Sequence, residues 1–428
     1  MRSCQNNDDK EYVAYVGIDW ADRSHRVCLR AAGSDHDEQR DLAQEPLALR
    51  TWANELRARF PQGRIAVAVE QSRGPLIYGL QGYEHLQLFM VNPATLTKYR
   101  EAATACSGAK DDPLDAQLAC EVLRLHRDWL RPLVLLPTQH RELQLLCEGR
   151  RGLVEQRTAL CEQLGAALKA YFPQALKLVG GELGAAMCTA FLSRWPTLAS
   201  VQRARAATLR RFYHEHNVRS AEVIQQRIDL VRTAVPLTDD AALLAVMPLQ
   251  VAACIGQLEA LRAFVADYDR RIAAVFAQQP HAKLFAALPG AGPQLAPRLA
   301  VAFGSDRDRY QSAEEIQRYS GIAPVKKKSG DGLDLTLWRW HCPTFLRQTF
   351  HEFAGCSIPQ SKWAHAYYHQ QLARGKTPNK AKRALAYKWQ RILFRCWKDN
   401  VPYSEETYLA ALRRRGSPLV SIIDELAA

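Results

Sequence analysis

Four acidic side chains stand where they could act together on a phosphate. Asp19 and Glu70 each follow a short run of β-branched residues, at the point where the chain would leave a sheet. Such strand ends line the crevice in which open α/β sheets bind ligands. Asp112 and Asp115 lie three residues apart at the start of a predicted helix, so both can project from one face of that helix. The four carboxylates could therefore converge on one point.

A cluster of four carboxylates needs a cation. Without one, the like charges raise one another's pKa and oppose ionisation. Mg²⁺, with Mn²⁺ as a substitute, takes oxygen ligands and keeps waters for substrate phosphates. Two such ions about 4 Å apart can clamp the attacking and leaving oxygens of a phosphodiester. For any single acid, a helix cap or a solvent-facing carboxylate is the simpler reading, so the metal hypothesis depends on the complete set.

A second reactive group follows a run of three lysines. Ser329 comes directly after Lys326, Lys327 and Lys328 and before Gly330. Serine is a poor nucleophile at its free pKa and needs activation. The lysines could stabilise an alkoxide and hold a phosphate against it, and the glycine would let DNA approach the backbone. Taken alone, these residues favour a basic surface loop whose serine only caps or forms hydrogen bonds.

The elements that must position the acids alternate between strands and helices. The first two predicted strands are expected to pair antiparallel. Strands are predicted at residues 12–19, 26–32, 65–69 and 86–91, and helices at 42–60, 75–83 and 115–130. This alternation predicts an α/β domain over residues 10–135.

The middle of the chain, residues 136–280, has helical spacing instead. Leucine, isoleucine and valine recur at intervals of three and four near both ends of this segment. Between them lie shorter helical pieces that we expect to be broken at Pro173, Pro196, Pro236 and Pro248. The pattern predicts an antiparallel helical arm or coiled coil with an inserted helical bundle. An ordinary helical domain without a binding role fits the pattern nearly as well.

The positive charge is concentrated near the C-terminus. From Arg318 to Lys398 there are 16 Lys and Arg against three acids, a difference of +13 that equals the net charge of the whole chain. Such a surface suits phosphates, because affinity grows with the number of counterions released. The alternative is a solvated basic face. Aromatic side chains are interleaved with these charges; some could stack on bases, and several are expected to serve the core: Trp338, Trp340, Trp363, Tyr367, Tyr368, Tyr387, Trp389 and Trp397.

Other classes of protein are poorly supported. The 428 residues predict two or three domains. The polar N-terminus lacks a signal core, and no uninterrupted apolar stretch approaches the roughly 20 residues of a membrane span. Eleven scattered cysteines without a CxxC pair argue against a zinc site and for a reducing cytosol. We therefore expect a cytoplasmic protein without a membrane partner.

Four segments share the pattern of a known family: Gly17–Asp19, Val69–Gly74, Asn92–Pro93 and Lys110–Ala116. They resemble the RuvC-like domain of the DEDD transposases, the insertion-sequence one-hundred-and-ten family. Its pattern Lys-x-Asp-x-x-Asp-Ala assigns the helical pair to Asp112 and Asp115, whereas Asp111 occupies a position that is usually uncharged. The resemblance implies an RNase H-like fold, Mg²⁺ held by all four acids, and branched or paired DNA as substrate.

The C-terminal third resembles the second domain of the same family. Gly321–Pro324 followed by Ser329–Gly330 is similar to its Gly-Leu-x-Pro…Ser-Gly signature, and Leu288–Pro293 to its Pro-Gly-x-Gly turn. That turn could contact a phosphate or be a plain turn. The resemblance implies that Ser329 joins covalently to DNA. The sequence departs from the family at Leu337–Pro343, where many members have a Lys/Arg-rich stretch, so contacts made there cannot be transferred.

Together the residues and the resemblance predict a transposase. The expected architecture is an α/β RNase H-like (RuvC-like) N-terminal domain, a helical or coiled-coil middle, a mostly α serine transposase domain at 281–415, and a tail at 416–428. The resemblance implies a dimer or tetramer in the bacterial cytosol, guided by a structured non-coding RNA that pairs with donor and target DNA. The basic side chains expected to contact nucleic acid are Lys326, Lys327, Lys328, Arg339, Arg347, Lys380, Lys382 and Arg383.

Two other readings stay open. A hydrolytic Holliday-junction resolvase needs the four acids but no covalent serine. A protein that binds RNA or DNA without catalysis needs neither centre.

Overall fold

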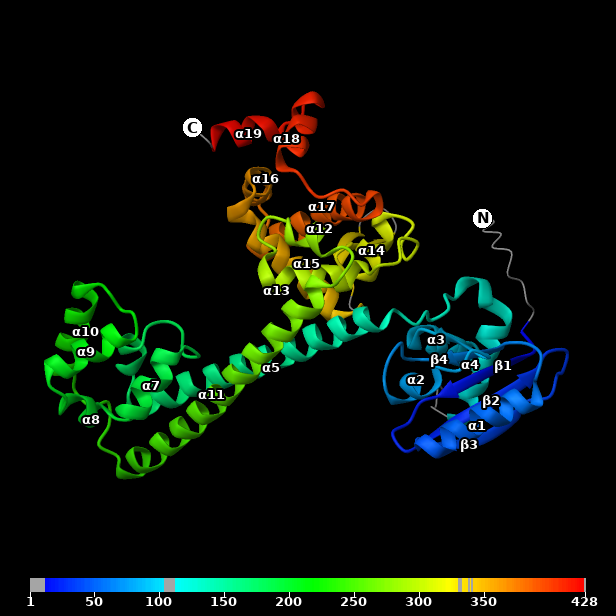
Figure 1. Ribbon diagram of the computed structural model, residues 1–428, viewed down its shortest axis with the longest axis horizontal. Coiled ribbons are helices and arrows are strands. Elements are labelled where there is room, and N and C mark those ends of the chain that lie inside the picture. The colour runs from blue at the N-terminus through cyan, green and yellow to red at the C-terminus, as the bar shows by residue number, and fades with distance from the viewer. Residues whose placement is uncertain (1–11, 104–111, 330–332, 338, 340–341, 427–428) are drawn as a thin grey trace. The chain divides into compact units, whose positions relative to one another are not determined.

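The chain divides into two compact units, Met1–Leu136 and Pro137–Ala428 (Figure 1). The computed structural model describes residues 12–103, 112–329, 333–337, 339 and 342–426, and the side chains of these residues except 103, 112, 326–329 and 333–336. The division falls one residue from the expected end of the α/β domain. The expected boundaries after residues 280 and 415 stay predictions.

The first unit contains a mixed five-stranded sheet. Its order is β3-β2-β1-β4-β5, in which β1 pairs antiparallel with β2 and parallel with β4, and β4 pairs parallel with β5. The strands are β1 (Ala14–Asp19), β2 (Ser24–Ala31), β3 (Glu38–Ala43), β4 (Ile65–Val69) and β5 (Leu86–Met90). The four predicted strands are confirmed, including the antiparallel pair.

Strand β3 was not predicted. The sequence analysis began a helix at Leu42, but α1 (Pro46–Arg59) begins four residues later. Strand β3 is at the edge of the sheet, and Leu42 is its one buried hydrophobic side chain. An edge strand with so little burial carries almost no alternation of polar and apolar residues, which explains the error.

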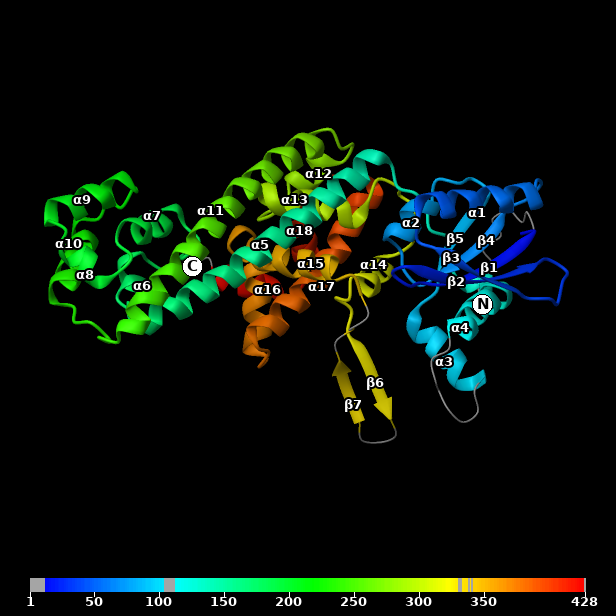
Figure 2. The same ribbon diagram turned by 90° about the horizontal axis from the view of Figure 1, so that it is seen from below.

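Helices cover both faces of this sheet. Helix α1 and α2 (Pro75–Leu80) pack on the face that contains Val16, Ile18 and Val67. Helix α4 (Asp112–His126) packs on the opposite face against Ala66 and Ala68, beside α3 (Pro93–Ala103), which was not predicted. Figure 2 shows α1 and α4 on opposite sides of the strands. The split follows from the alternation of side chains along a strand.

Gly17 allows α4 to approach β1 closely. A Cβ atom at this position would lie 2.0 Å from the carbonyl oxygen of Ala116 and 2.4 Å from the amide nitrogen of Cys120. Only a residue without a side chain permits contact at this distance. The contact fixes the first turns of α4 beside the carboxyl-terminal half of β1.

The second unit is built on two long helices. Helix α5 (Thr138–Tyr171) runs antiparallel to α11 (Ala241–Ala277). Arg150 Nε lies 2.6 Å from Asp269 Oδ1 near one end, and Leu164 shares a core with Leu258 towards the other. The predicted antiparallel arm is confirmed (Figure 1).

Pro248 does not break the arm, contrary to expectation. It lies inside α11, where it removes one backbone hydrogen bond. The neighbouring Val246 and Leu249 are exposed, so water can satisfy the carbonyl that loses its donor. The helix therefore continues through the proline.

Helix α11 is also more apolar than the sequence analysis recognised. An 18-residue window of α11 has a mean hydropathy of 1.8, which is enough, by length and composition alone, to cross a membrane. Gln250 and Gln257 interrupt the apolar residues of this helix, so the expectation that no uninterrupted apolar stretch approaches about 20 residues is not contradicted. In the structure Val251, Ile255 and Leu258 pack into a helical core, so this helix is an apolar support of the arm.

The inserted bundle consists of five helices around an aromatic core. Phe191, Trp195 and Phe212 pack with ring centroids 5.1–5.7 Å apart. The helices are α6 (Ala175–Leu178), α7 (Ala186–Arg194), α8 (Leu198–Gln202), α9 (Ala206–Glu215) and α10 (Ala221–Thr233). The predicted insertion between the long helices is confirmed.

The remainder is mostly helical and carries one hairpin. The hairpin strands β6 (Val325–Ser329) and β7 (Leu333–Leu337) extend away from the helices in Figure 2. The helices are α12 (Ala282–Ala286), α13 (Gly292–Phe303), α14 (Ala313–Tyr319), α15 (Thr344–Ser357), α16 (Lys362–Ala373), α17 (Pro378–Asp399), α18 (Glu405–Arg414) and α19 (Leu419–Glu425). Leu419 and Ile423 are buried, so most of the segment expected as a tail packs as a helix.

Most of the described aromatic side chains in the basic segment belong to the core. Trp363, Trp389 and Trp397 are fully buried, and their rings pack against one another and against Phe303 and Tyr408. These three tryptophans serve the core, as several of the aromatic residues in this segment were expected to do, and they are not available to stack on bases. Trp338 and Trp340 lie outside the described residues.

Candidate active site

The carboxyl-terminal edge of β1 and β4 brings two acids together. Asp19 ends β1, and Glu70 directly follows β4. The strands are parallel, with Ile18 opposite Val69, so the next residue of each strand is adjacent to the other. Asp19 is buried and Glu70 is half-buried. Parallel pairing thus joins two acids that are 51 residues apart in the sequence.

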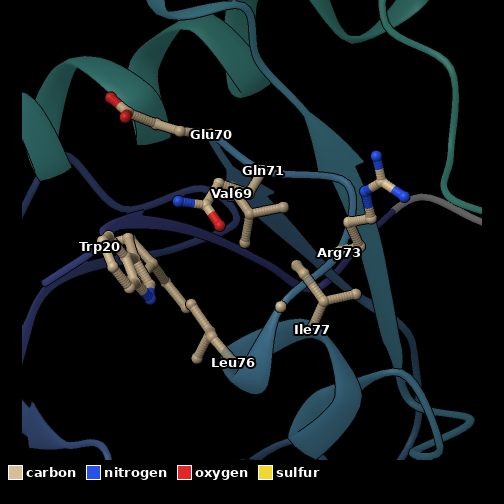
Figure 3. A pocket seen from close by; sticks show the side chains of 9 residues that line it. Trp20, Val69, Glu70, Gln71, Arg73, Leu76 and Ile77 are labelled. Carbon is tan, nitrogen blue, oxygen red and sulfur yellow. The ribbon is translucent and has the colours of Figure 1, made fainter. Parts of the chain in front are cut away.

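Both acids lie on the face of the sheet that α4 covers. Asp19 has the same strand parity as Gly17, which contacts α4, and Glu70 has the same parity as Ala68. In Figure 3 the Glu70 carboxylate points away from Leu76 and Ile77, which belong to the core of the other face. The two carboxylates are therefore presented towards the start of α4.

Helix α4 supplies the third described carboxylate. Asp115 precedes Ala116, whose carbonyl oxygen closely approaches Gly17, and the Asp115 side chain is only 1% exposed. Asp112 is the first residue of the same helix, and its side chain lies outside those described. The three-residue spacing places both on one face of the first turn.

The described acids do not form a closed metal site. Among the side chains that the structure describes, no three His, Cys, Asp or Glu residues make a group that could hold a metal ion. The donor set itself fits a hard divalent cation, since Asp19, Glu70 and Asp115 offer only carboxylate oxygens at one edge of the sheet. The Mg²⁺ prediction is compatible with this chemistry and stays a prediction.

Arg100 forms an ion pair with the carboxylate of Asp115. Arg100 Nε donates to Asp115 Oδ1 and Nη2 donates to Oδ2, both at 2.6 Å. The guanidinium comes from α3 and is 16% exposed. Two parallel hydrogen bonds between charged groups make this a strong and directional pair. The sequence analysis missed Arg100, because no spacing rule relates it to a residue 15 positions away on another helix.

A small pocket lies beside Glu70, on the side of Leu76 and Ile77. It is lined by Ile18 and Trp20 from the end of β1 and by Glu70, Gln71 and Arg73 from the loop after β4 (Figure 3). In Figure 3 the Arg73 guanidinium and the Glu70 carboxylate point in opposite directions. The loop after β4 therefore contributes one acidic and one basic side chain, which point away from each other.

The second predicted centre lies in the other unit. Ser329 is the last residue of β6, with Leu333 opposite it in β7. The side chains of Ser329, Lys326, Lys327 and Lys328 lie outside those described. The structure thus places the serine at the end of a hairpin strand and not in the loop that its local sequence favours.

The base of this hairpin is anchored to α17. Arg383 Nε donates to the carbonyl oxygen of Ile322 at 3.0 Å, and its Nη2 donates to that of Ala323 at 3.3 Å. Gln390 Nε2 donates to Ser320 Oγ at 2.7 Å, and both side chains are fully buried. These bonds hold the turn and loop that lead into β6. The sequence analysis did not find this anchoring role.

The other predicted nucleic-acid contacts differ in exposure. Lys380 is exposed, whereas Lys382, Arg339 and Arg347 are half-buried. Arg347 donates towards Cys342 Sγ at 3.7 Å. The described contacts of Arg383 are with the protein backbone. All of these contacts with nucleic acid stay predictions.

The Pro-Gly-x-Gly turn has a packing role. Gly290 has φ 78°, a conformation that side chains disfavour. A Cβ atom there would lie 2.4 Å from the carbonyl oxygen of Cys356, at the end of α15. Close packing accounts for this glycine without a phosphate.

Comparison with known proteins places both segments in transposases. Residues 16–173 match a family described as "Transposase", and residues 282–369 match the "Transposase IS116/IS110/IS902 family". The "Mini-circle putative transposase for IS117" of Streptomyces coelicolor is 24% identical over 94% of this chain and 97% of its own length.

Two further relatives belong to insertion elements. An uncharacterized 43.6 kDa protein of insertion element IS110 from Streptomyces coelicolor is 24% identical over 92% of this chain and 96% of its own length. An uncharacterized 42 kDa protein of insertion element IS900 from Mycobacterium paratuberculosis is 26% identical over 74% and 78%. The similarity covers both units.

Proposed function

Because this chain belongs to the IS116/IS110/IS902 family of transposases, we propose that it cuts and rejoins DNA at the ends of a mobile element with two sets of residues, four acids and a serine. The observation that carries the proposal is the gathering of Asp19, Glu70 and the start of α4 at one edge of the sheet. One strand, its parallel neighbour and a helix each contribute acids, which supports an RNase H-like fold for the first unit.

The acids are proposed as the ligands of Mg²⁺ or Mn²⁺. Asp19, Glu70, Asp112 and Asp115 would hold the cation, which supplies positive charge for the developing charge at a scissile phosphate. Asp19 and Asp115 are buried, so their carboxylates are held in fixed positions. Pre-positioned ligands reduce the reorganisation needed to bind the substrate.

The serine is proposed as the nucleophile. Ser329 Oγ forms a bond to the phosphorus, the bond from phosphorus to one sugar oxygen breaks, and that oxygen takes up a proton. The phosphoserine ester keeps the energy of the broken bond, so a DNA hydroxyl can attack it, release the serine and reseal the strand. The anchored base of the hairpin supports this role, because a nucleophile must be held in place.

Sequence specificity is proposed to come from RNA. A structured non-coding RNA of the element would pair with donor and target DNA, and the basic surface of the second unit would hold phosphate backbones. The fully buried tryptophans leave fewer candidates for base stacking, which favours backbone contacts. Sequencing the RNA that purifies with the protein from bacterial cytoplasm tests this proposal, and recovery of only random fragments would contradict it.

The serine step is tested by trapping protein on cleaved DNA. The unmutated protein is incubated with element ends, the guide RNA and Mg²⁺, and covalent complexes are separated under denaturing conditions. We expect a protein–DNA adduct that Ser329→Ala abolishes. Cleavage without an adduct in the unmutated protein would favour the hydrolytic resolvase.

The acid site is tested with two neighbouring residues. Asp112→Ala is expected to abolish cutting while DNA binding persists, because the metal ligand is lost and the basic surface is intact. Asp111→Ala is the matched control and is expected to keep most of the activity. Unchanged activity in Asp112→Ala would favour a protein that binds nucleic acid without catalysis. Light scattering tests the proposed dimer or tetramer.

A further inference from the structure

A fixed positive charge sits on one of the proposed metal ligands. Asp115 has both carboxylate oxygens engaged by Arg100, at 2.6 Å each, and neither side chain has more than 16% of its surface exposed. Arginine stays protonated at every working pH. The guanidinium therefore balances the negative charge of the Asp115 carboxylate before any divalent cation binds.

The pair has a physical reason to exist in the metal-free chain. Asp19 ends β1 and Glu70 directly follows β4, and Asp115 lies in the first turn of α4, which packs against the same face of the sheet. Burying like charges together is costly unless a positive group compensates them. Arg100 supplies that compensation.

We propose that Arg100 is a positioning residue that holds Asp115 in the metal-free protein and competes with the divalent cation for its carboxylate. This inference rests on the proposed function of Asp115 as a metal ligand. Loading the site requires the guanidinium to give up at least one carboxylate oxygen. Because two positive groups near one carboxylate repel each other, the cation binds more weakly than it would to the acids alone.

A purely structural ion pair predicts the opposite result. If Arg100 only fastens α3 to α4, its loss destabilises the protein and leaves the metal affinity equal or weaker. If it competes with the cation, its loss makes the metal bind more tightly. The affinity for metal therefore separates the two roles, and the melting temperature alone does not.

In the experiment, the full-length protein without nucleic acid is titrated with Mn²⁺, and calorimetry measures the binding. We expect Arg100→Gln to bind Mn²⁺ at least about tenfold more tightly than the unmutated protein. Arg100→Lys keeps the charge but loses the paired geometry, so it should fall between them. Arg124→Gln is the matched control and should bind as the unmutated protein does, since it removes one exposed charge about 13 Å along the same helix as Asp115.

A thermal readout keeps the test informative if Arg100→Gln folds poorly. In EDTA this variant should melt below the unmutated protein, and saturating Mn²⁺ should raise its melting temperature by more than it raises that of the unmutated protein. Equal or weaker Mn²⁺ binding in Arg100→Gln would overturn the competition and leave the proposed metal site standing. No Mn²⁺ binding by either protein would overturn the metal site as well.

Discussion

At the scale of single residues, two small features shape the candidate site. Gly17 has no side chain, so the backbone of α4 can lie against β1. Arg100 donates hydrogen bonds to both oxygens of Asp115, a carboxylate that would otherwise be buried without this positive partner. Neither residue is an acid of the predicted set. Gly17 sets how closely α4 approaches β1, and Arg100 holds the carboxylate of Asp115.

Gly17→Ala should strongly destabilise the first unit. The new methyl group would lie 2.0 Å from a backbone oxygen, which neither strand nor helix can avoid without moving. We expect a loss of about 3 kcal/mol or more in the free energy of unfolding, measured by denaturant titration. Gly82→Ala is the control, because a Cβ atom there meets nothing within 4 Å, and it should change stability by less than about 1 kcal/mol. Equal effects of the two substitutions would contradict the close contact.

At the scale of elements, buried polar contacts connect helices that do the positioning. Helix α17 carries the exposed Lys380 and the inward-facing Arg383 and Gln390. Arg383 bonds to the loop before β6, and Gln390 bonds to Ser320 at the end of α14. One helix thus combines an anchoring face with a basic face. A substitution on the anchoring face should therefore have a different effect from a substitution on the basic face.

Arg383→Gln should impair the serine step more than binding. It removes hydrogen bonds to the carbonyl oxygens of Ile322 and Ala323, so the hairpin that carries Ser329 is less well fixed. We expect the yield of covalent protein–DNA complex at saturating DNA to fall about tenfold or more. Lys380→Gln, on the exposed face of the same helix, should weaken DNA binding and leave the yield at saturation unchanged. An unchanged yield in Arg383→Gln would remove the anchoring role.

The junction between α5 and the C-terminal core should be sensitive to acid. Burial and the nearby Arg309 lower the pKa of His140 to about 4 from 6.5, so the folded protein keeps this ring neutral. The unfolded chain binds a proton below about pH 6.5 that the folded chain rejects, and stability is therefore lost as the pH falls from 6.5 towards 4.

His140→Gln should remove part of this pH dependence. Between pH 7 and pH 4, the change in the free energy of unfolding should be smaller in the variant by on the order of 3 kcal/mol. Denaturant titrations of both proteins at each pH measure this difference. The variant should be the less stable protein at pH 7, because the buried ring packs there. Parallel stability curves for the two proteins across this range would rule out a buried neutral histidine.

In the molecule as a whole, the predicted acids and the basic segment belong to different units. The acids belong to the first unit, whereas Ser329 and the basic segment belong to the second. The core of the second unit takes the tryptophans out of that basic segment. Its remaining exposed cations suit phosphates of any sequence.

Nucleic-acid affinity should depend steeply on salt. The logarithm of the binding constant is expected to fall linearly with the logarithm of salt concentration, and each lysine that contacts a duplex phosphate contributes about 0.9 to the slope. Lys380→Gln should reduce the slope by about this amount. Lys177→Gln, an exposed lysine of the inserted bundle, is the control and should leave it unchanged. Equal slopes for all three proteins would exclude Lys380 from the interface.

Much of the fold could be predicted from the amino-acid sequence. Period-two and helical patterns predicted four strands of the first sheet, the antiparallel arm and the insertion, because those segments bury one regular face. The acids at the ends of β1 and β4 could be identified for the same reason. Weakly buried β3, the helix through Pro248 and the hairpin around Ser329 escaped prediction, since their local patterns do not report their partners.

Which of these residues lie close together depends on how the strands and helices pack. Parallel pairing set Asp19 beside Glu70, the missing side chain of Gly17 drew α4 onto β1, and Arg100 reached Asp115 from another helix. The same packing buried three tryptophans that a list of residue types would assign to nucleic acid. Proximity across the chain is a property of packed backbones, and the linear order of residues does not contain it.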